Sequence, residues 1–490
     1  LRQCRIKPKK GVMLDFLNDL INGKILIAVL IPLGLIFTIW SRGVQFRLFG
    51  SMFSVLGQGF QHETDQPSSF QALALSVAGR VGGGNIAGVA AALALGGPGA
   101  IFWMWIVGLV GMATSYFECT LAQVYKQKEP NGDFRGGPAY YIKHGLGKKL
   151  GGAAPVLGFA YSLLLLVTFG FAFICFQSFA TTSSMDSAFG APRLWSGIGL
   201  GVVVSLVIFG GVRRIASVAE IIVPVMAVFY ALLGLYVLLT HLPQIPAAFS
   251  TIFLSAFGFN EAVAGGIGGA IMMGVNRGLF SNEAGLGSAP NVAAAAYVEH
   301  PAQQGMVQSL SVFIDTIIMC TVTALIIILS TQSYIGVDDE VQGVLTQLAL
   351  ADHVGDWAEF FIAFALFLFA FSSIMYSYYL GENAVDYYIP DNMFAVYVYR
   401  FMVIGFVLLG STIQLGDVLS FSDVTMGLLA IVNLFAVALL FPIGLRVMRD
   451  FDAQRKAGVK VPVFDPDQFD DLDIDKAAWQ LTERSGGPSG

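Results

Sequence analysis

The hydrophobic residues of this chain fall into long runs that are separated by short polar segments. Each run holds roughly 17 to 27 residues, and a helix of about 20 apolar residues is long enough to cross the hydrocarbon core of a bilayer. The runs contain Pro and Gly, so they predict helices rather than the tilted strands of a barrel. We therefore predict eleven membrane-spanning helices, at residues 24–40, 71–93, 100–124, 155–179, 195–211, 216–240, 257–280, 304–330, 355–380, 396–415 and 423–445.

The second predicted span interrupts itself. Its middle reads GRVGGGN from Gly79 to Asn85, and each glycine lowers helix propensity by about 1 kcal/mol relative to Ala. In lipid, backbone N–H and C=O groups freed by such a break are tolerated only where they line a cavity or meet another polar group. The break indicates a solute or ion site near the middle of the membrane. The alternative is close packing of helices through small residues.

A second glycine-rich stretch, residues 264–269, lies in the seventh predicted span. Two interrupted spans, each opening a set of five, indicate an internal repeat. Because five is an odd number, the second set must be inverted relative to the first. We predict repeats at about 71–240 and 257–445, with one extra helix before them. The alternative is coincidence in a chain with 56 glycines.

The composition agrees with a membrane protein. Hydrophobic residues make up 56% of the 490 positions and charged residues only 12%, whereas a soluble chain carries about a quarter charged residues. The four cysteines give no argument for disulfides. We predict an all-α integral membrane protein with one transmembrane domain at residues 1–450. A polar, acidic tail follows at 451–490, and we expect it to be disordered.

The basic residues predict the orientation, because Lys and Arg are concentrated in cytoplasmic loops. If the first span enters from outside, most basic residues of the membrane domain lie in inner loops, and the outer loops between spans hold only Arg193. Five basic residues within the first ten positions conflict with this orientation. We expect the N-terminus outside and the C-terminus in the cytoplasm.

Uncharged polar side chains in three spans could bind a solute or an ion. Asn85, at the first break, could offer its oxygen to a cation or its amide to a substrate. Gln177, in the fourth span, could bind substrate or bond to a neighbouring helix. Ser372 and Ser373, in the ninth, could supply hydroxyl ligands to Na⁺. The alternative for both serines is a hydrogen bond back to a carbonyl of their own helix.

Ionisable side chains inside a membrane are costly when they are unpaired. Glu118, Glu220 and Glu382 fall near cytoplasmic ends of spans, where we expect structural or gating roles, with Arg80 as the partner of one of them. Asp315 lies deeper and could serve in a relay or in a structural network. The sequence has no catalytic grouping of Ser, His and Asp and no metal-spaced set of Cys and His. We therefore expect no enzyme activity and no nucleic-acid partner.

Several long motifs follow one another as they do in the alanine or glycine:cation symporter family, which the chain resembles over residues 20–450. The family's fold is similar to the leucine-transporter five-plus-five inverted repeat, preceded by one extra helix. Its members carry small amino acids inward, chiefly alanine and glycine, with Na⁺ and sometimes H⁺. The motifs are VGGGNIAG at 81–88, GGPGAIFWMW at 96–105, GMAT at 111–114, RGGPAYY at 135–141, RGLFSNEAGLGSAP at 277–290 and FIDT at 313–316.

The resemblance implies which residues form a substrate site and an ion site. Two positions depart from the family: Gly83 stands where a Thr or Ser is common, and Ser377 stands where some members have a Trp. The missing Trp leaves room for a substrate larger than alanine. The implied substrate site comprises Gly82, Gly83, Gly84 and Asn85 for the carboxylate, Gln177 nearby, and Ile174, Gly266, Ile267, Ile271 and Ser377 around the side chain. The implied Na⁺ site comprises carbonyls near Gly79, Val81 and Phe369 and the hydroxyls of Ser372 and Ser373.

We therefore expect a sodium-coupled symporter that imports alanine or glycine by alternating access across a plasma membrane, such as a bacterial inner membrane. One alternative is a carrier of another neutral amino acid such as serine or glutamine, coupled to Na⁺ or H⁺. A second is an amino-acid-gated cation channel, which would need an acidic ring or a carbonyl filter. Na⁺ is the expected coupling ion, without a cofactor. The amino acid and membrane lipid are the expected partners, and the sequence leaves the oligomeric state open.

Overall fold

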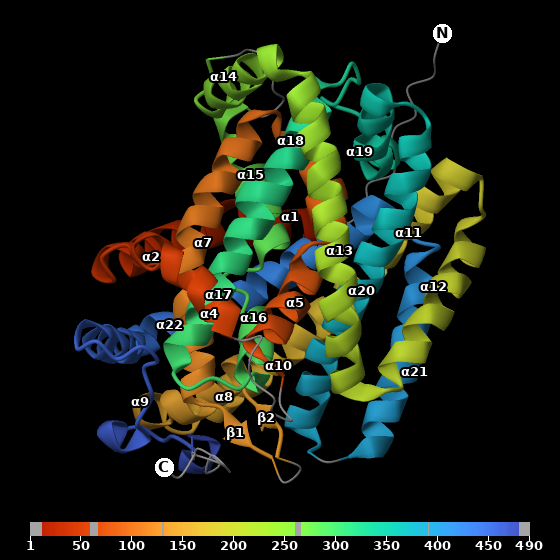
Figure 1. Cartoon of the computed structure of the whole chain (residues 1–490). Helices are drawn as coiled ribbons and strands as arrows, with labels where there is room; N and C mark the ends of the chain where they lie inside the picture. The colour runs from red at the N-terminus through yellow and green to blue at the C-terminus, as the bar shows by residue number, and fades with distance from the viewer. Residues whose placement is uncertain (1–11, 59–66, 130–131, 260–265, 391, 480–490) are drawn as a thin grey trace, which may run out of the picture.

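A computed structural model of the chain describes residues 12–58, 67–129, 132–259, 266–390 and 392–479. This part is helical apart from one antiparallel hairpin, in which β1 (Gln127–Lys128) pairs with β2 (Phe134–Arg135). Most helices stand side by side in a tall bundle, and the hairpin lies at one end of it (Figure 1). The all-helical class with many apolar helices, predicted from the hydrophobic pattern, is confirmed.

Eight helical segments in the described ranges are long and apolar enough to cross a membrane, and a bent pair of helices makes a ninth. Each overlaps one of the predicted spans. The other two predictions, 195–211 and 257–280, fall on shorter helices. The eight segments are Phe16–Trp40, Gly99–Val124, Ala153–Phe189, Ser217–Thr240, Pro301–Leu329, Trp357–Tyr388, Met393–Gly410 and Val418–Lys456, and the bent pair is Ser69–Arg80 with Gly84–Gly96.

Several of the long segments contain a π-helical turn, a feature that is frequent at functional sites. In chain order, the elements up to the middle of the chain are α1 (Val12–Leu20), η1 (Ile21–Leu26), α2 (Ile27–Trp40), α3 (Val44–Arg47), α4 (Phe49–Gln58), α5 (Ser69–Arg80), η2 (Gly84–Gly88), α6 (Val89–Gly96), α7 (Gly99–Val124), α8 (Pro138–Tyr140), η3 (Tyr141–Gly145), α9 (Gly147–Leu150), α10 (Ala153–Val167), η4 (Thr168–Phe173), α11 (Ile174–Phe189), α12 (Arg193–Ile208), α13 (Gly211–Thr240), η5 (Leu242–Gln244) and α14 (Ile245–Ala256). The remaining elements are α15 (Gly266–Asn282), α16 (Ser288–Ala295), α17 (Pro301–Val312), η6 (Phe313–Met319), α18 (Cys320–Leu329), α19 (Asp339–Val354), α20 (Trp357–Tyr388), α21 (Met393–Gly410), α22 (Leu415–Lys456), η7 (Pro466–Phe469) and η8 (Lys476–Trp479).

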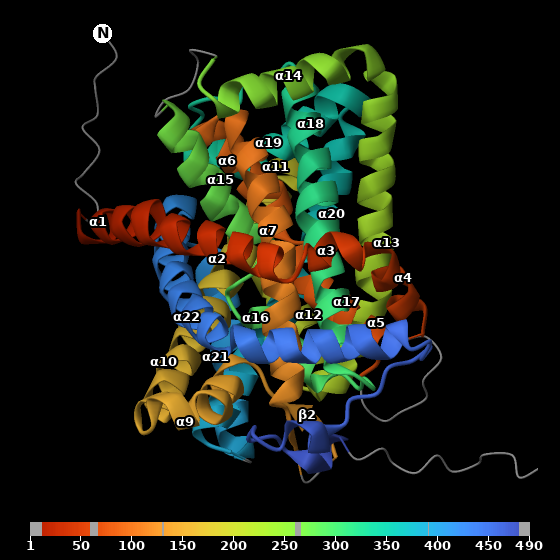
Figure 2. The ribbon, with the colours of Figure 1, turned by 90° about the vertical axis from the view of Figure 1, so that its left-hand side faces the viewer.

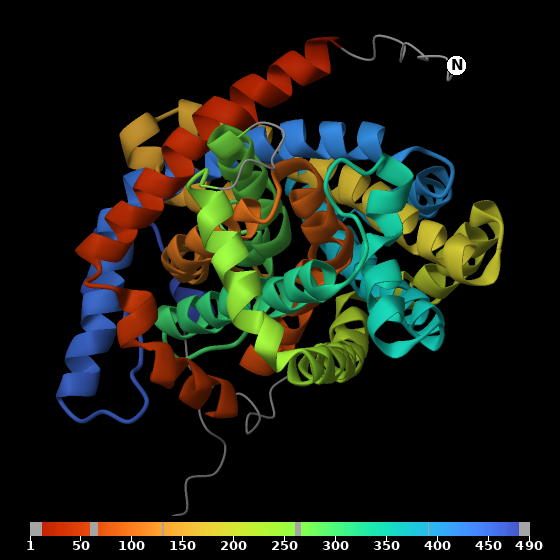
Figure 3. The same ribbon diagram turned by 90° about the horizontal axis from the view of Figure 1, so that it is seen from above.

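The first predicted span differs from the others in its direction. α1, η1 and α2 form one long helical segment that runs across the outside of the bundle, transverse to α7 (Figure 2). Seen from above, the same segment follows the periphery of the molecule (Figure 3). Hydropathy reports the length and apolarity of a helix, whereas its tilt is set by the helices it packs against. The sequence could therefore predict this apolar helix but not its direction.

The second half contains a helix break, but at another place than the sequence predicted. α15 is continuous from Gly266 through most of the expected break at 264–269, whose first two residues lie outside the described ranges. The helix stops after Asn282 and restarts as α16. In between, Glu283 has φ 56° and Gly285 has φ 95°, both in the left-handed region. Left-handed backbone ends a helix, whereas glycine alone inside an apolar helix only weakens it.

The tail also differs from the expectation of disorder at 451–490. α22 continues to Lys456, and the chain then folds back against the end of the bundle that holds the hairpin (Figure 1). Asp473 lies 2.8 Å from His144, and Asp471 lies 2.6 Å from Arg446. The Arg446 guanidinium holds the pKa of the Asp471 carboxyl below its usual range. Basic loops supply the counter-charges for this acidic segment, and composition alone does not report them. Residues 480–490 lie outside the described ranges.

Candidate functional site

The first broken helix lies with its open backbone against α11 and α20. α5 and α6 meet at an angle of 47°. A side chain at Gly82 would place its Cβ 2.5 Å from the Ser373 Oγ and 3.0 Å from the Gln177 Nε2, and one at Gly83 would place it 3.0 Å from the Gln177 Oε1. A side chain at Gly82 would therefore displace the Ser373 hydroxyl, whereas one at Gly83 would need a small shift of its neighbours, and the backbone of the break touches the side chains of both neighbouring helices.

Two N–H groups of the break are bound by side chains. The Gly83 N–H donates to the Gln177 Oε1 at 3.0 Å, and the Gly82 N–H donates to the Asn85 Oδ1 at 3.0 Å. Asn85 is 1% exposed and Gln177 is 2% exposed. The structure thus brings together four of the predicted substrate residues. Gly84 follows directly, and its Cα faces the Phe280 ring.

Both the oxygen and the nitrogen of the Asn85 side-chain amide form hydrogen bonds. Its oxygen is bonded to the Gly82 N–H, so the structure does not aim it at a cation. Its nitrogen donates to the Asp315 Oδ1 at 2.6 Å and to the Ser281 Oγ at 3.2 Å. Asp315 and Ser281 belong to the motifs FIDT and RGLFSNEAG, which carried the resemblance. The spacing of those motifs in the sequence does not indicate that either residue contacts Asn85.

The two serines of α20 do different things. The Ser373 hydroxyl crosses to α5 and donates to the Ala78 oxygen at 2.9 Å and to the Gly79 oxygen at 3.0 Å. The Ser372 hydroxyl donates back to the Phe369 oxygen of its own helix at 2.9 Å. Carbonyl and hydroxyl oxygens are ligands of the kind that suits Na⁺, and the Ser373 hydroxyl meets two such carbonyls near the end of α5. The chemistry of these oxygens is compatible with a sodium ion.

Tyr376 links this oxygen cluster to the second break. A Cβ at Gly79 would overlap the Tyr376 ring, so the ring lies directly against the end of α5. Its hydroxyl donates to the Glu283 Oε2 at 2.9 Å. The same oxygen accepts a hydrogen bond from Ser288 at 2.5 Å. Glu283 is a non-glycine residue with positive φ, and such strain persists only where surrounding contacts fix it.

Arg80 does not form the ion pair that the sequence predicted. Its guanidinium is buried and donates to the main-chain oxygen of Gln308 at 3.3 Å and to the Ser311 hydroxyl. Glu118 instead accepts the Gly285 N–H at 3.2 Å. Glu220, the second proposed partner, accepts from the Gln71 amide at 3.0 Å. Glu118 also accepts from the Asn433 amide at 2.8 Å. Neutral donors from the second break and from neighbouring helices therefore take the role that the sequence gave to Arg80.

The residues predicted around the substrate side chain do not all meet. Ile174 is fully buried on α11 and Ser377 is 2% exposed on α20. Ile267 is 44% exposed near the start of α15, one residue after Gly266, and Ile271 follows one turn later. α15 reaches the first break only near its other end.

Aromatic side chains occupy the apolar side of the first break. The Phe280 ring is stacked on Phe173 at a centroid distance of 4.6 Å and meets Phe176 edge-on at 4.9 Å. Phe280 lies inside the motif at 277–290 but was not among the predicted site residues. The second break was predicted at the opposite end of α15, where Ile267 and Ile271 lie, and not beside Phe280.

A helix that the sequence did not predict covers the outer part of the break. α19 lies at the end of the bundle opposite the hairpin (Figure 1). Its Thr346 hydroxyl donates to the Ile86 oxygen at 3.0 Å, and its Gln347 oxygen accepts from Ser184 at 2.6 Å. The contacts of Thr346 and Gln347 make α19 a cover over η2.

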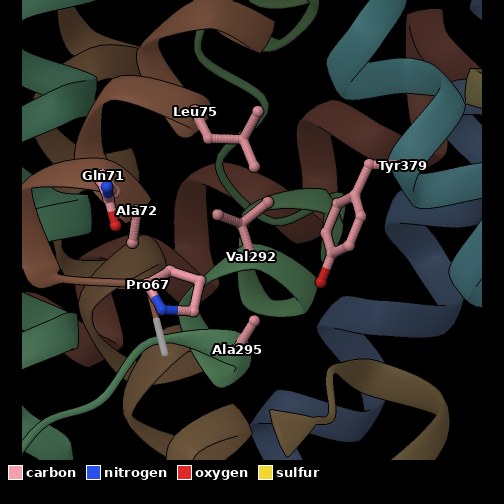
Figure 4. Close-up of a pocket in the computed structure, with 7 residues that line it drawn as sticks. All are labelled: Pro67, Gln71, Ala72, Leu75, Val292, Ala295 and Tyr379. Carbon is pink, nitrogen blue, oxygen red and sulfur yellow. The ribbon is translucent and has the colours of Figure 1, made fainter. Parts of the chain in front are cut away.

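On the hairpin side, α5 packs against α16 with a small hollow between them (Figure 4). The wall from α5 consists of Gln71, Ala72 and Leu75, and Val292 of α16 stands opposite. Tyr379 of α20 closes the hollow on one side (Figure 4).

Known proteins are similar in sequence to this chain over nearly its whole length. The family described as the sodium:alanine symporter family matches residues 9–466. The amino-acid carrier protein AlsT of Bacillus subtilis is 46% identical over 458 residues, covering 92% of this chain and 96% of that protein. The probable sodium/glutamine symporter GlnT of the same organism is 42% identical, covering 91% of each. The sodium/alanine symporter AgcS of Methanococcus maripaludis is 36% identical, covering 91% of this chain and 98% of that protein.

Among solved structures, a manganese transporter from Eremococcus coleocola is similar in fold. The TM-score is 0.51 at 15% sequence identity, and the match covers 77% of this chain and 78% of that one. At this identity the similarity shows the fold alone. The bundle described above is thus a membrane-transporter fold.

Proposed function

This chain belongs to the sodium:alanine symporter family, and from that premise we propose that it imports alanine and glycine together with Na⁺ by alternating access. It is a transporter with several membrane-spanning helices, and its class of activity is sodium-coupled symport of small amino acids. The observation that carries the proposal is the open backbone at Gly82 and Gly83, bounded by Gln177 and by the Ser373 hydroxyl.

We place the substrate carboxylate at Gly82, Gly83, Gly84 and Asn85. The Gln177 amide oxygen occupies the position in which a carboxylate oxygen would accept the same hydrogen bond from the Gly83 N–H. A rotation of Gln177 would free that N–H, and its amide could then donate to the bound carboxylate. Hydrogen bonds to a charged group are worth about 1.5–3 kcal/mol each, which is enough to drive such an exchange.

The substrate side chain then faces the aromatic wall of Phe176 and Phe280, with Ile174 behind it. The proposal leaves out Gly266, Ile267 and Ile271, which lie towards the far end of α15. Ser377 is the residue that we expect to widen the range of substrate sizes that the site accepts. Glutamine is a second candidate substrate, because the chain is 42% identical to a probable sodium/glutamine symporter.

We place Na⁺ between the end of α5 and the middle of α20. Carbonyl oxygens near Gly79 and Val81 and the Phe369 oxygen would hold it, with the Ser372 and Ser373 hydroxyls. Na⁺ bound there would supply positive charge beside the first break and fasten α5 to α20. These oxygens come from two different helices, so binding of the ion depends on their relative position. That dependence is how ion binding and helix movement are coupled.

We further propose eleven membrane segments: the α1–α2 segment, strongly tilted relative to the bundle, followed by two inverted halves of five, one from α5 to α13 and one from α15 to α22. Each half opens with a broken helix, α5 with α6 and α15 with α16, which supports the repeat. The end of the bundle with the hairpin and the basic loops faces the cytoplasm in this proposal. The N-terminus then lies outside and the C-terminus inside a bacterial inner membrane.

Uptake by the purified protein in liposomes tests the function. We expect labelled alanine to accumulate only with an inward Na⁺ gradient, and unlabelled alanine inside to accelerate entry. A current without such exchange would instead indicate a channel. A panel of unlabelled glycine, serine and glutamine as inhibitors gives the substrate range. Ser377→Trp should narrow that range towards glycine and alanine, because the indole fills volume, and an unchanged profile would remove Ser377 from the site.

A further inference from the structure

Asp315 lies at the meeting point of three helical segments. It is in η6, it is 0% exposed, and its carboxylate accepts hydrogen bonds from Asn85, Ser281 and Thr316. Asn85 belongs to the first break, and Ser281 lies two residues before the second break. One carboxylate thus connects the two broken helices.

The two oxygens of the carboxylate have separate partners. Oδ1 accepts from the Asn85 nitrogen at 2.6 Å. Oδ2 accepts from the Ser281 and Thr316 hydroxyls, each at 2.8 Å. Both oxygens act only as acceptors, as they do in an ionised carboxylate. The bond between Asn85 and Asp315 can therefore be changed while the partners of Oδ2 stay in place.

An asparagine side chain has one acceptor end and one donor end. At Asn85, the Gly82 N–H requires the acceptor end on one side, and the Asp315 Oδ1 requires the donor end on the other. We infer that Asp315 is the positioning residue that fixes the Asn85 amide and, through it, keeps the Gly82 N–H in place at the substrate's carboxylate site. The inference rests on the substrate site proposed above.

Other charged groups near Asp315 are already engaged. Arg80, on α5, donates to Gln308 and Ser311. Glu283, after α15, accepts from Ser288 and Tyr376. Cys320, on α18, lies 3.3 Å from the Asn85 nitrogen but is only a weak acceptor. The Asn85 nitrogen also donates to the Ser281 Oγ at 3.2 Å and to the Asp315 main-chain oxygen at 3.4 Å. The bond to the Asp315 carboxylate, at 2.6 Å, is the shortest of these and the one to a charged group, so it is the contact that orients Asn85.

Asp315→Asn tests this arrangement. An amide at position 315 can keep its oxygen towards Ser281 and Thr316, but it then presents NH₂ to the NH₂ of Asn85. If Asn85 flips to remove this conflict, it turns NH₂ towards the Gly82 N–H. We expect the alanine concentration for half-maximal uptake to rise roughly ten- to a hundredfold. The Na⁺ concentration for half-maximal uptake should stay within about threefold, since the oxygens around Ser373 are untouched.

Thr316→Val is the matched control. It removes one hydrogen bond from the same carboxylate but leaves the bond to Asn85. Half-saturating alanine should stay within about threefold of wild type, because this hydroxyl does not reach the break. If this variant raises the half-saturating alanine concentration as much as Asp315→Asn does, then loss of any hydrogen bond at the carboxylate is sufficient to weaken alanine binding, and the positioning role is wrong.

The reciprocal double variant, Asn85→Asp with Asp315→Asn, restores the bond between positions 85 and 315 and keeps the bond to the Gly82 N–H, but not the longer bond from position 85 to the Ser281 Oγ. Asp at position 85 accepts from the Gly82 N–H and from the new amide at 315, and that amide's oxygen accepts from Ser281 and Thr316. We expect the thermal stability lost in Asp315→Asn to recover in the double variant, whereas alanine affinity recovers only in part because the carboxylate now at position 85 faces the substrate's carboxylate. Should Asp315→Asn not fold, recovery of folding in the double variant carries the test, and a double variant no more stable than Asp315→Asn refutes the inference.

The two proposals fail in different ways. Wild-type protein that takes up no alanine in the presence of Na⁺ would refute the proposed function. Active wild-type protein together with an unchanged alanine curve in Asp315→Asn would refute the positioning role and leave the proposed function standing.

Discussion

Replacing Ser373 with alanine removes a side chain that joins α20 to the end of α5. The hydroxyl donates to the Ala78 and Gly79 oxygens at 2.9 and 3.0 Å and is 1% exposed. Its loss leaves two buried carbonyl oxygens without this donor, and an unsatisfied buried polar group costs about 1–3 kcal/mol. Without Na⁺, we expect the free energy of unfolding to fall by an amount in that range.

The same change removes a ligand from the proposed Na⁺ site. Loss of one hydroxyl ligand should raise the Na⁺ concentration for half-maximal uptake roughly ten- to a hundredfold, if its contact resembles a hydrogen bond to a charged group. Ser372→Ala is the comparison, because the Ser372 hydroxyl bonds only within its own helix to Phe369. It should cost little stability, so any shift in its Na⁺ curve reports ligation alone.

The assay is labelled alanine uptake into liposomes that contain equal amounts of each protein, with Na⁺ varied and osmolarity held constant. Thermal unfolding in detergent, with and without Na⁺, gives the stability. If Ser373→Ala lowers stability but leaves the Na⁺ curve in place, the hydroxyl only fastens two helices. The ion site would then have to lie elsewhere.

Three further changes test other contacts. Gly79→Ala drives a methyl group into the Tyr376 ring and should lower the free energy of unfolding by about 1–3 kcal/mol. Gly88→Ala is the control, because a Cβ there meets open space and should change that free energy little. Thermal unfolding measures both. Thr346→Val removes the bond from α19 to the first break and should speed opening of that cover, measured as faster hydrogen exchange in α19. The docked tail should protect the hairpin from protease, and this protection should weaken with added salt, because the tail binds through exposed ion pairs that salt screens. Deleting residues 458–490 should abolish the protection. In the intact protein, acidification below the usual carboxyl range should release the tail in the same assay, because a carboxyl with a lowered pKa stabilises the docked form only while it is ionised.

The sequence by itself determined the helical class, the apolar segments and the position of the first break. Burial in lipid demands about 20 apolar residues per crossing, and GGGN inside such a run has few structural alternatives. Gly82 proves to be a position where a Cβ would lie 2.5 Å from the Ser373 hydroxyl, so the local chemistry and the tertiary contacts agree there. Gln177 and Ser373 could be selected as polar residues in apolar helices, and both meet the break.

Only the tertiary structure decided which distant residues those groups meet. Asn85 and Asp315 are 230 positions apart, and no local pattern reports that their side chains form a hydrogen bond. The second break lies at Glu283, where neighbouring contacts hold a strained backbone, and not at the glycines that helix propensity selected. The direction of α1 and α2 and the docking of the acidic tail likewise depend on surfaces supplied by other parts of the chain. Propensity and hydropathy are sums over neighbours in sequence, whereas these features are set by neighbours in space.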